Sequence, residues 1–137
     1  MCGEKIAEAV LEMVREVEKG SKEYEEQDTV HYSLHTYLHD HRTVVYKVSR
    51  GAGHSTAAKL LHTSLPNSIL VSSRAGPKAP SGEHCFSFDD ITEGKARGVR
   101  YDYVIVDNWS HVAPVDRGFI QEFCLLQHYT PVLILLA

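Results

Sequence analysis

A glycine-rich segment that joins a strand-like run to a helix-like run is the first feature of this sequence that could do chemistry. Thr43 to Val48 is β-branched and aromatic, and it is followed by two glycines and then by the apolar run Ala57 to Leu61. Backbone N–H groups at such a turn, together with the N-terminus of the following helix, attract negative charge. The segment therefore predicts a phosphate-binding site made of Arg50, Gly51, Ala52, Gly53, His54, Ser55 and Thr56.

Residue types within this segment suit phosphate and magnesium. Gly51 and Gly53 carry no side chain that would keep phosphate oxygens away from the backbone. The hydroxyl group of Ser55 or Thr56 could hold a magnesium ion.

A second candidate stands at the end of another apolar run. Tyr103 to Val106 is almost continuously apolar and stops at Asp107, a pattern typical of a strand that is buried on both faces. Ligands of open parallel sheets bind at the carboxyl ends of the strands, so we expect Asp107 at the same end of the sheet as the glycine-rich segment. Asn108, which follows, could orient a water molecule but cannot accept its proton.

Further patterns predict the elements that must position these residues. Ser68 to Ser72 and Pro131 to Leu136 are two more short apolar runs, His84 to Phe88 is a weaker strand signal, and a helix is expected from about Asp116 to Gln127. The order β-α-β-β-β-α-β predicts an α/β fold, with a small open parallel sheet that is doubly wound by flanking helices.

The first third of the chain predicts a helical hairpin in front of this sheet. Apolar residues recur at helical spacing over residues 4–19, and Gly20 stands where a glycine commonly ends a helix. Residues 21–27 are expected to connect this helix to a second one that runs to about Asp40. We expect one domain, 1–137, in which residues 1–42 form the hairpin and residues 43–137 form the α/β core.

Composition predicts a cytoplasmic protein that does not enter membranes. No apolar run is long enough to span a bilayer, and the N-terminus lacks the pattern of a secretory signal. The three cysteines, Cys2, Cys85 and Cys124, are an odd number at wide spacing, which suits a reducing compartment. With a net charge of -4, the chain has no overall attraction for nucleic acid, so any such contact must be local.

Taken together, the two motifs resemble those of the P-loop NTPases, including the recombinase-like and viral packaging ATPases. The first motif of that superfamily is G-x-x-x-x-G-K-[ST] between a strand and a helix, and it aligns with Val48 to Ser55. Gly53 and Ser55 match, whereas Val48 replaces the first glycine and His54 replaces the phosphate-binding lysine. The second motif is an apolar strand that ends in an aspartate, as at Asp107.

This resemblance implies a divergent P-loop protein that binds a nucleotide, ATP or GTP, with Mg²⁺ held by Ser55 and Asp107. It also implies that the strand of Asp107 lies next to the loop strand in the sheet. Many family members have a catalytic glutamate where this chain has Asn108, so the resemblance supports binding more strongly than hydrolysis. If the chain hydrolyses the nucleotide, the resemblance implies that Asp107 and Asn108 are the catalytic residues.

The phosphate-binding lysine is a positive charge of the family pattern that this chain lacks. Arg50 or Arg42 could supply the charge that His54 lacks as a neutral imidazole. Other family groups, such as a sensor of the γ-phosphate or an arginine finger, are either absent or would come from another subunit, and the second case implies a homo-oligomer.

Alternatives remain open. The chain could be a non-catalytic module that uses the loop or the helical hairpin to contact a protein or a nucleic acid. A glycine-rich turn and an aspartate at a strand end also occur for purely structural reasons. His31, His35 and His39 share one helical face, where a pair could bind a metal ion, although a polar helix flank is the favoured interpretation. Trp109 could stack on a base or a partner.

Overall fold

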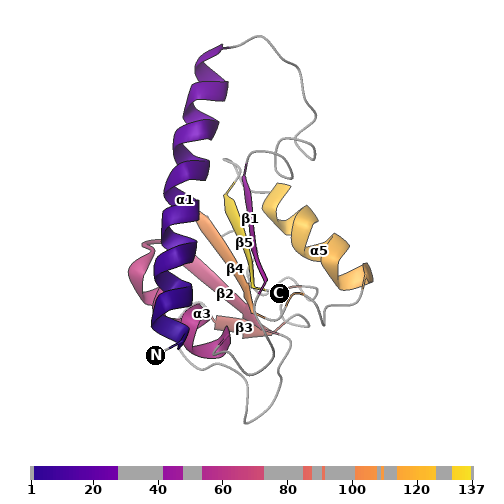
Figure 1. Cartoon of the computed structure of the whole chain (residues 1–137). Coiled ribbons are helices and arrows are strands. Elements are labelled where there is room, and N and C mark those ends of the chain that lie inside the picture. Colours follow the sequence, from indigo (N-terminus) through magenta and orange to yellow (C-terminus); the bar gives the residue numbers. More distant parts are fainter. Residues whose placement is uncertain are drawn as a thin grey trace.

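The described part of the chain is an α/β fold built on one parallel sheet. The computed structural model describes residues 2–27, 42–47, 54–72, 85–87, 91, 101–107, 109, 114–125 and 131–136. Five strands form the sheet in the order β1-β5-β4-β2-β3, and every pairing is parallel (Figure 1). The elements are α1 (Cys2–Gln27), β1 (Thr43–Tyr46), α3 (His54–Ser64), β2 (Ser68–Ser72), β3 (Cys85–Ser87), β4 (Tyr103–Asp107), α5 (Pro114–Leu125) and β5 (Val132–Leu136). The predicted parallel sheet is confirmed, and its strands follow the predicted order, but Ile91 between β3 and β4 is helical, which the predicted order of elements did not include.

Helices cover both faces of this sheet. We call the face that packs on α1 and α3 the α1/α3 face, and the opposite one the α5 face (Figure 1). Successive residues of a strand alternate between the two faces. On β4, Ile105 belongs to the core of the α1/α3 face, whereas Val104 and Val106 belong to the core of the α5 face. Burial on both faces explains why the strands are continuously apolar rather than alternating.

Helix α1 continues beyond the point where the sequence predicted its end. It buries Ile6, Val10 and Val14 against the sheet and α3, and it runs through Gly20 to Gln27. Gly20 does not have the left-handed φ that a helix-ending glycine adopts, and the Glu and Lys residues after it favour helix. The predicted helix end at Gly20 and the predicted connection over residues 21–27 are therefore wrong.

The C-terminus of α3 is closed by the side chain of Ser68. The chain reverses direction at Asn67, whose φ of 56 is in the left-handed region. Ser68 Oγ lies 2.9 Å from the carbonyl oxygen of Leu65 and 3.1 Å from that of His62, and it is 2.8 Å from His62 Nδ1. A buried hydroxyl thereby satisfies polar groups at the helix end, where carbonyls have no partner within the helix.

At the amino end of the sheet, a hydrogen bond ties β4 to α1. The hydroxyl group of Tyr103 donates to Glu18 Oε1 at 2.7 Å. Burial, followed by this hydrogen bond and the negative charge of Glu18, raises the pKa of Tyr103 to about 12. On the same end, Asn67 Nδ2 donates to Asp102 Oδ2 at 3.3 Å. These polar contacts hold elements together at the end of the sheet opposite to Asp107.

The second helix of the predicted hairpin, with His31, His35 and His39, lies outside the described residues.

Two further predictions concern residues that the structure describes. Cys85 and Cys124 form no disulfide. None of the helices α1, α3 and α5 combines the length and the apolar character needed to cross a bilayer.

We expect Tyr103→Phe to lower the free energy of unfolding by about 1 kcal/mol at pH 7, because the hydrogen bond to Glu18 is lost. Since the folded-state pKa lies above the ordinary value of 10.0, the contribution of Tyr103 is present below pH 10 and lost as the pH rises toward 12. Urea denaturation of both proteins at pH 7 and across pH 10 to 12 measures this. A difference between them that does not shrink above pH 10 would contradict the assignment.

Candidate functional site

Terminal residues of the strands form one row at the carboxyl end of the sheet. In the pairing register, Tyr46 stands beside Leu136, Leu136 beside Asp107, and Asp107 beside Ser72. Asp107 and Ser72 are both buried, with 7% and 3% of their surface exposed. Among the described residues, Asp107 is the one charged residue that is buried. A buried carboxylate next to a buried hydroxyl is therefore the chemical feature of this end of the sheet.

Both of these side chains belong to the α1/α3 face. Ile105 and Leu70, two residues earlier on β4 and β2, lie in the core of that face. Because strand residues alternate between faces, Asp107 and Ser72 are on the same side as these two. Helix α3 packs on β4 and β2, so it covers the two strands that end in Asp107 and Ser72.

Helix α3 also begins at this end of the sheet. It follows the carboxyl end of β1, runs back along the sheet and leads into β2, which is parallel to β1. Its first N–H groups make no hydrogen bond within the helix, and its dipole is positive at that end. The first turn of α3 therefore directs N–H donors and positive potential toward the end of the sheet that holds Asp107.

The position of Asp107 relative to β1 differs from the expectation. The resemblance implied that the strand of Asp107 lies next to the loop strand, but β5 lies between β1 and β4. Two strand spacings separate β1 from β4 by roughly 10 Å. That expectation is wrong, because the apolar strand β5 has both faces buried and occupies an interior position between β1 and β4. The connection between the glycine-rich segment and Asp107 is α3, which follows that segment in the chain and packs on β4.

The predicted site residues are placed as follows. Arg50, Gly51, Ala52, Gly53 and Asn108 lie outside the described residues. His54 and Ser55 form the start of α3, of which the backbone is described, and Thr56 is an exposed residue of its first turn. Asp107 is the last residue of β4. The structure thus brings the start of α3 and the end of β4 to the same end and face of the sheet.

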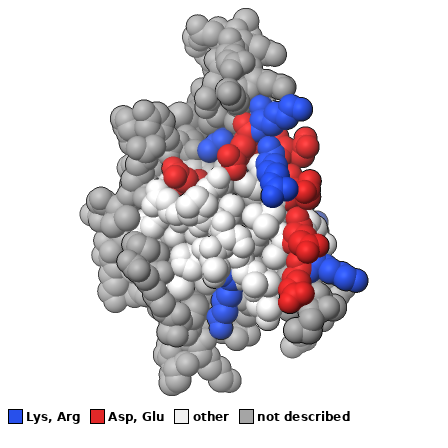
Figure 2. All heavy atoms as spheres, turned by 90° about the vertical axis from the view of Figure 1, so that its left-hand side faces the viewer, with Lys and Arg blue, Asp and Glu red and all other residues white. Residues whose placement is uncertain are grey.

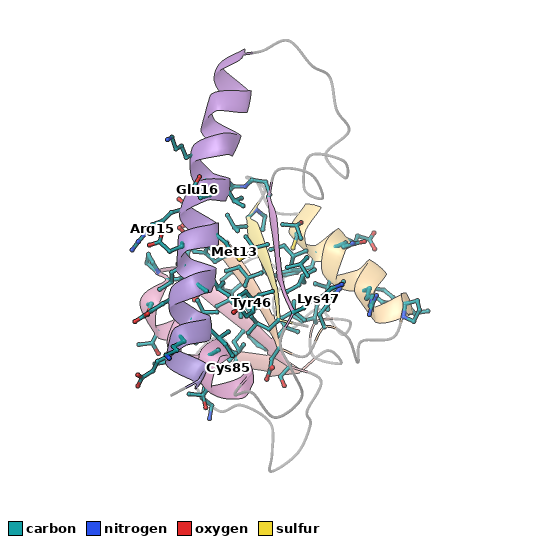
Figure 3. All side chains as sticks on the ribbon, in the orientation of Figure 1. Met13, Arg15, Glu16, Tyr46, Lys47 and Cys85 are labelled. Carbon is teal, nitrogen blue, oxygen red and sulfur yellow. The ribbon has the colours of Figure 1, made fainter. Side chains whose placement is uncertain are left out.

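Of the basic residues considered for phosphate, Arg42 is at the wrong end. It immediately precedes β1, at the amino end of the sheet, and its carbonyl accepts a hydrogen bond from the N–H of Leu133 at 2.8 Å. Lys47 instead follows the carboxyl end of β1 and is exposed (Figure 3). Tyr46, just before it, packs toward the core of the α1/α3 face. Lys47 is therefore a cation at the same end as Asp107, and Arg42 is not.

A tryptophan and an arginine flank the site on the α5 face. Trp109, two residues after Asp107, packs against the core of that face. Arg117 in the first turns of α5 places its guanidinium carbon 5.0 Å from the centre of the Trp109 ring, and its Nη2 donates to the Trp109 carbonyl at 3.1 Å. One guanidinium group thereby fixes the chain after β4 to the start of α5.

Ser72 and Arg117 were not among the residues predicted for this site. Ser72 is the last residue of a predicted strand, and that position was a usable signal, since strand ends meet at one end of a parallel sheet. Arg117 carried no comparable signal, because its contact with Trp109 depends on where α5 packs.

The oxygen groups present suit magnesium better than a transition metal. In the described part of the chain, no group of three or more His, Cys, Asp or Glu residues could hold a metal ion. Magnesium commonly takes only one or two carboxylates and completes its shell with water and phosphate oxygens. Asp107 makes other interactions within the protein, and its Oδ1 atom is buried and accepts no hydrogen bond from the described residues. One carboxylate beside a hydroxyl fits a Mg²⁺ that is shared with a phosphate ligand.

Neither Cys85 nor Cys124 is suited to act as a nucleophile. Burial raises the pKa of Cys124 to about 12. Burial also raises the pKa of Cys85, although the nearby charge of Lys59 partly lowers it. Both thiols are therefore protonated at neutral pH, when the reactive form of a cysteine is the thiolate.

Comparison with protein-family models, with curated proteins and with solved structures finds no match for this chain.

We expect Arg117→Met to shift the fluorescence of Trp109 to longer wavelength, because the ring loses the guanidinium group that covers it. The chain has one tryptophan, so the emission reports on this position alone. Arg15→Met on α1 is the control, since Arg15 pairs with Glu12 at 3.0 Å and should leave the spectrum unchanged. An identical shift in both variants would show that the effect does not come from the Arg117 contact.

Proposed function

We propose that this chain binds a nucleoside triphosphate, ATP or GTP, with Mg²⁺ at the carboxyl end of its sheet. The phosphates would lie against the glycine-rich segment and the first turn of α3, and Asp107 would face the cation. The fold is thereby proposed to be a divergent form of the P-loop type.

The observation that carries this proposal is the position of Asp107 under α3. Its carboxylate is buried, it ends a strand on the α1/α3 face, and α3 covers that strand. Helix α3 in turn begins directly after Gly51 and Gly53, the residues that allow phosphate to approach the backbone. An aspartate that merely capped a helix end would not require the N-terminus of α3 at the same end and face of the sheet.

Charge at this end supports binding of an anion without the family's lysine. Helix α5 follows β4 and also begins at the carboxyl end. Each helix N-terminus contributes about half a positive charge. Lys47 follows the carboxyl end of β1 and is exposed, and a phosphate group would favour the protonated form of His54.

Hydrolysis is the weaker part of the proposal. Bound Mg²⁺ would neutralise charge on the phosphate oxygens. A water molecule that attacks the γ-phosphate has to be positioned, and Asn108 can orient it but cannot take its proton. We propose that the chain binds nucleotide and turns it over slowly or not at all.

A non-catalytic protein-binding module is the second candidate, and the surface of α1 favours it. Glu4, Glu8, Glu12 and Glu16 recur every four residues on α1, and all four are exposed. Figure 2 shows the acidic residues gathered in a line on this side of the molecule. Like charges at this spacing repel each other and weaken a helix. Such a surface suits a basic protein partner and disfavours nucleic acid at α1.

We expect a fluorescent ATP analogue to bind with Mg²⁺ and to quench Trp109 by energy transfer, since Trp109 is two residues from Asp107. Asp107→Ala should weaken binding in Mg²⁺ roughly tenfold or more, equivalent to at least about 1.4 kcal/mol. Asp102→Ala is the matched control, because Asp102 precedes the same strand but stands at the amino end and is exposed. Absence of binding by the unmodified chain at millimolar ATP or GTP would refute the proposal, and Mg²⁺-dependent turnover that is lost in Asp107→Ala would refute the non-catalytic module.

Restoring the family lysine tests whether the segment before α3 contacts phosphate. We expect His54→Lys to raise the affinity for MgATP on the order of tenfold, because an ammonium group replaces a weakly basic imidazole. A lysine placed elsewhere on α3, in Thr63→Lys at the exposed far end of the helix, controls for added positive charge. Equal affinities for His54→Lys, Thr63→Lys and the unmodified chain would mean that residue 54 does not face the phosphates.

A further inference from the structure

A second oxygen group stands beside Asp107 on the neighbouring strand. Ser72 ends β2 and is in register with Asp107, so their Cα atoms are about 4.8 Å apart across the parallel pair. Both residues lie on the α1/α3 face, and Ser72 is 3% exposed. Ser68 is the one other buried polar residue in the described part of the chain.

The two buried serines of β2 differ in what surrounds them. Ser68 begins the strand and is used at the end of α3, where carbonyl oxygens and His62 satisfy its hydroxyl. Ser72 ends the strand beside a carboxylate, under the helix whose first turn is the proposed phosphate contact. Ser72 already has an interaction within the protein, but a serine oxygen has two lone pairs and one proton and can serve more than one partner.

We infer that Ser72 is a ligand of the same cation as Asp107, a role that rests on the proposed nucleotide function. Oxygen ligands of octahedral Mg²⁺ lie 2.0–2.1 Å from the ion and hence about 3 Å from each other, which residues in register on adjacent strands can satisfy. The cation is then held by two neighbouring strand ends, and the phosphates and water complete its shell. Ser72 thereby makes the affinity for nucleotide depend on the metal.

The test measures nucleotide affinity with and without metal. The dissociation constant of the fluorescent ATP analogue is determined in Mg²⁺ and in EDTA for the full chain and its variants. We expect Ser72→Ala to weaken binding in Mg²⁺ roughly tenfold, as loss of groups around a metal commonly does, and to leave binding in EDTA unchanged. Ser68→Ala is the matched control, since it removes a buried hydroxyl from the same strand and face at the opposite end.

Replacement of the oxygen by sulfur identifies direct contact. Ser72→Cys keeps the size of the side chain, and a thiolate prefers soft cations to Mg²⁺. We expect this variant to lose nucleotide affinity in Mg²⁺ and to gain about tenfold over the unmodified chain in Cd²⁺. Both proteins contain the same other cysteines, so Cd²⁺ bound by those does not explain a difference between them. Far-UV circular dichroism confirms that each variant is folded before the comparison.

Each outcome decides a different point. Unchanged metal dependence in Ser72→Ala, or no gain in Cd²⁺ for Ser72→Cys, overturns the role of Ser72 and leaves the proposed nucleotide site standing. No binding by the unmodified chain under any condition overturns the proposed function, and the role of Ser72 with it.

Discussion

Burial of the central strands on both faces is the constraint on which the rest of this structure depends. Strands β2, β4 and β5 are almost entirely buried, and their side chains divide between a core under α1 and α3 and a core under α5. Parallel strands need long crossover connections, and the helices that cross over also cover the sheet. Because β1, β5, β4 and β2 all run in one direction, every such connection returns to the same end of the sheet. All parallel strands end at the opposite, carboxyl end of the sheet, so Asp107, Ser72 and the start of α3 are all found there.

A division between the two ends of the sheet follows from this constraint. At the amino end, polar groups such as Tyr103, Glu18, Asn67 and Asp102 bind each other and hold elements together. At the carboxyl end, a carboxylate and a hydroxyl are buried in the row of strand ends under the start of α3. This buried pair is the feature on which the proposed cation site rests.

Much of the fold could be predicted because its signals are local. Each strand except the shortest is a run of apolar and β-branched residues, and the order of runs was sufficient for a parallel sheet. The end of α1 was missed because a glycine at an exposed helical position weakens a helix without ending it when strong helix formers follow. The role first considered for Arg42 is not supported, because Arg42 precedes β1 at the amino end of the sheet, whereas Asp107 ends β4 at the carboxyl end.

The sequence by itself determined that Asp107 ends a buried strand and that a glycine-rich segment leads into a helix, since both depend on residue types within a few positions. Only the tertiary structure decided that β5 lies between β1 and β4, that α3 covers the strand of Asp107, and that Ser72 stands beside it. Strand order and helix placement arise from how apolar faces pack across the whole chain. No short stretch of sequence encodes that packing.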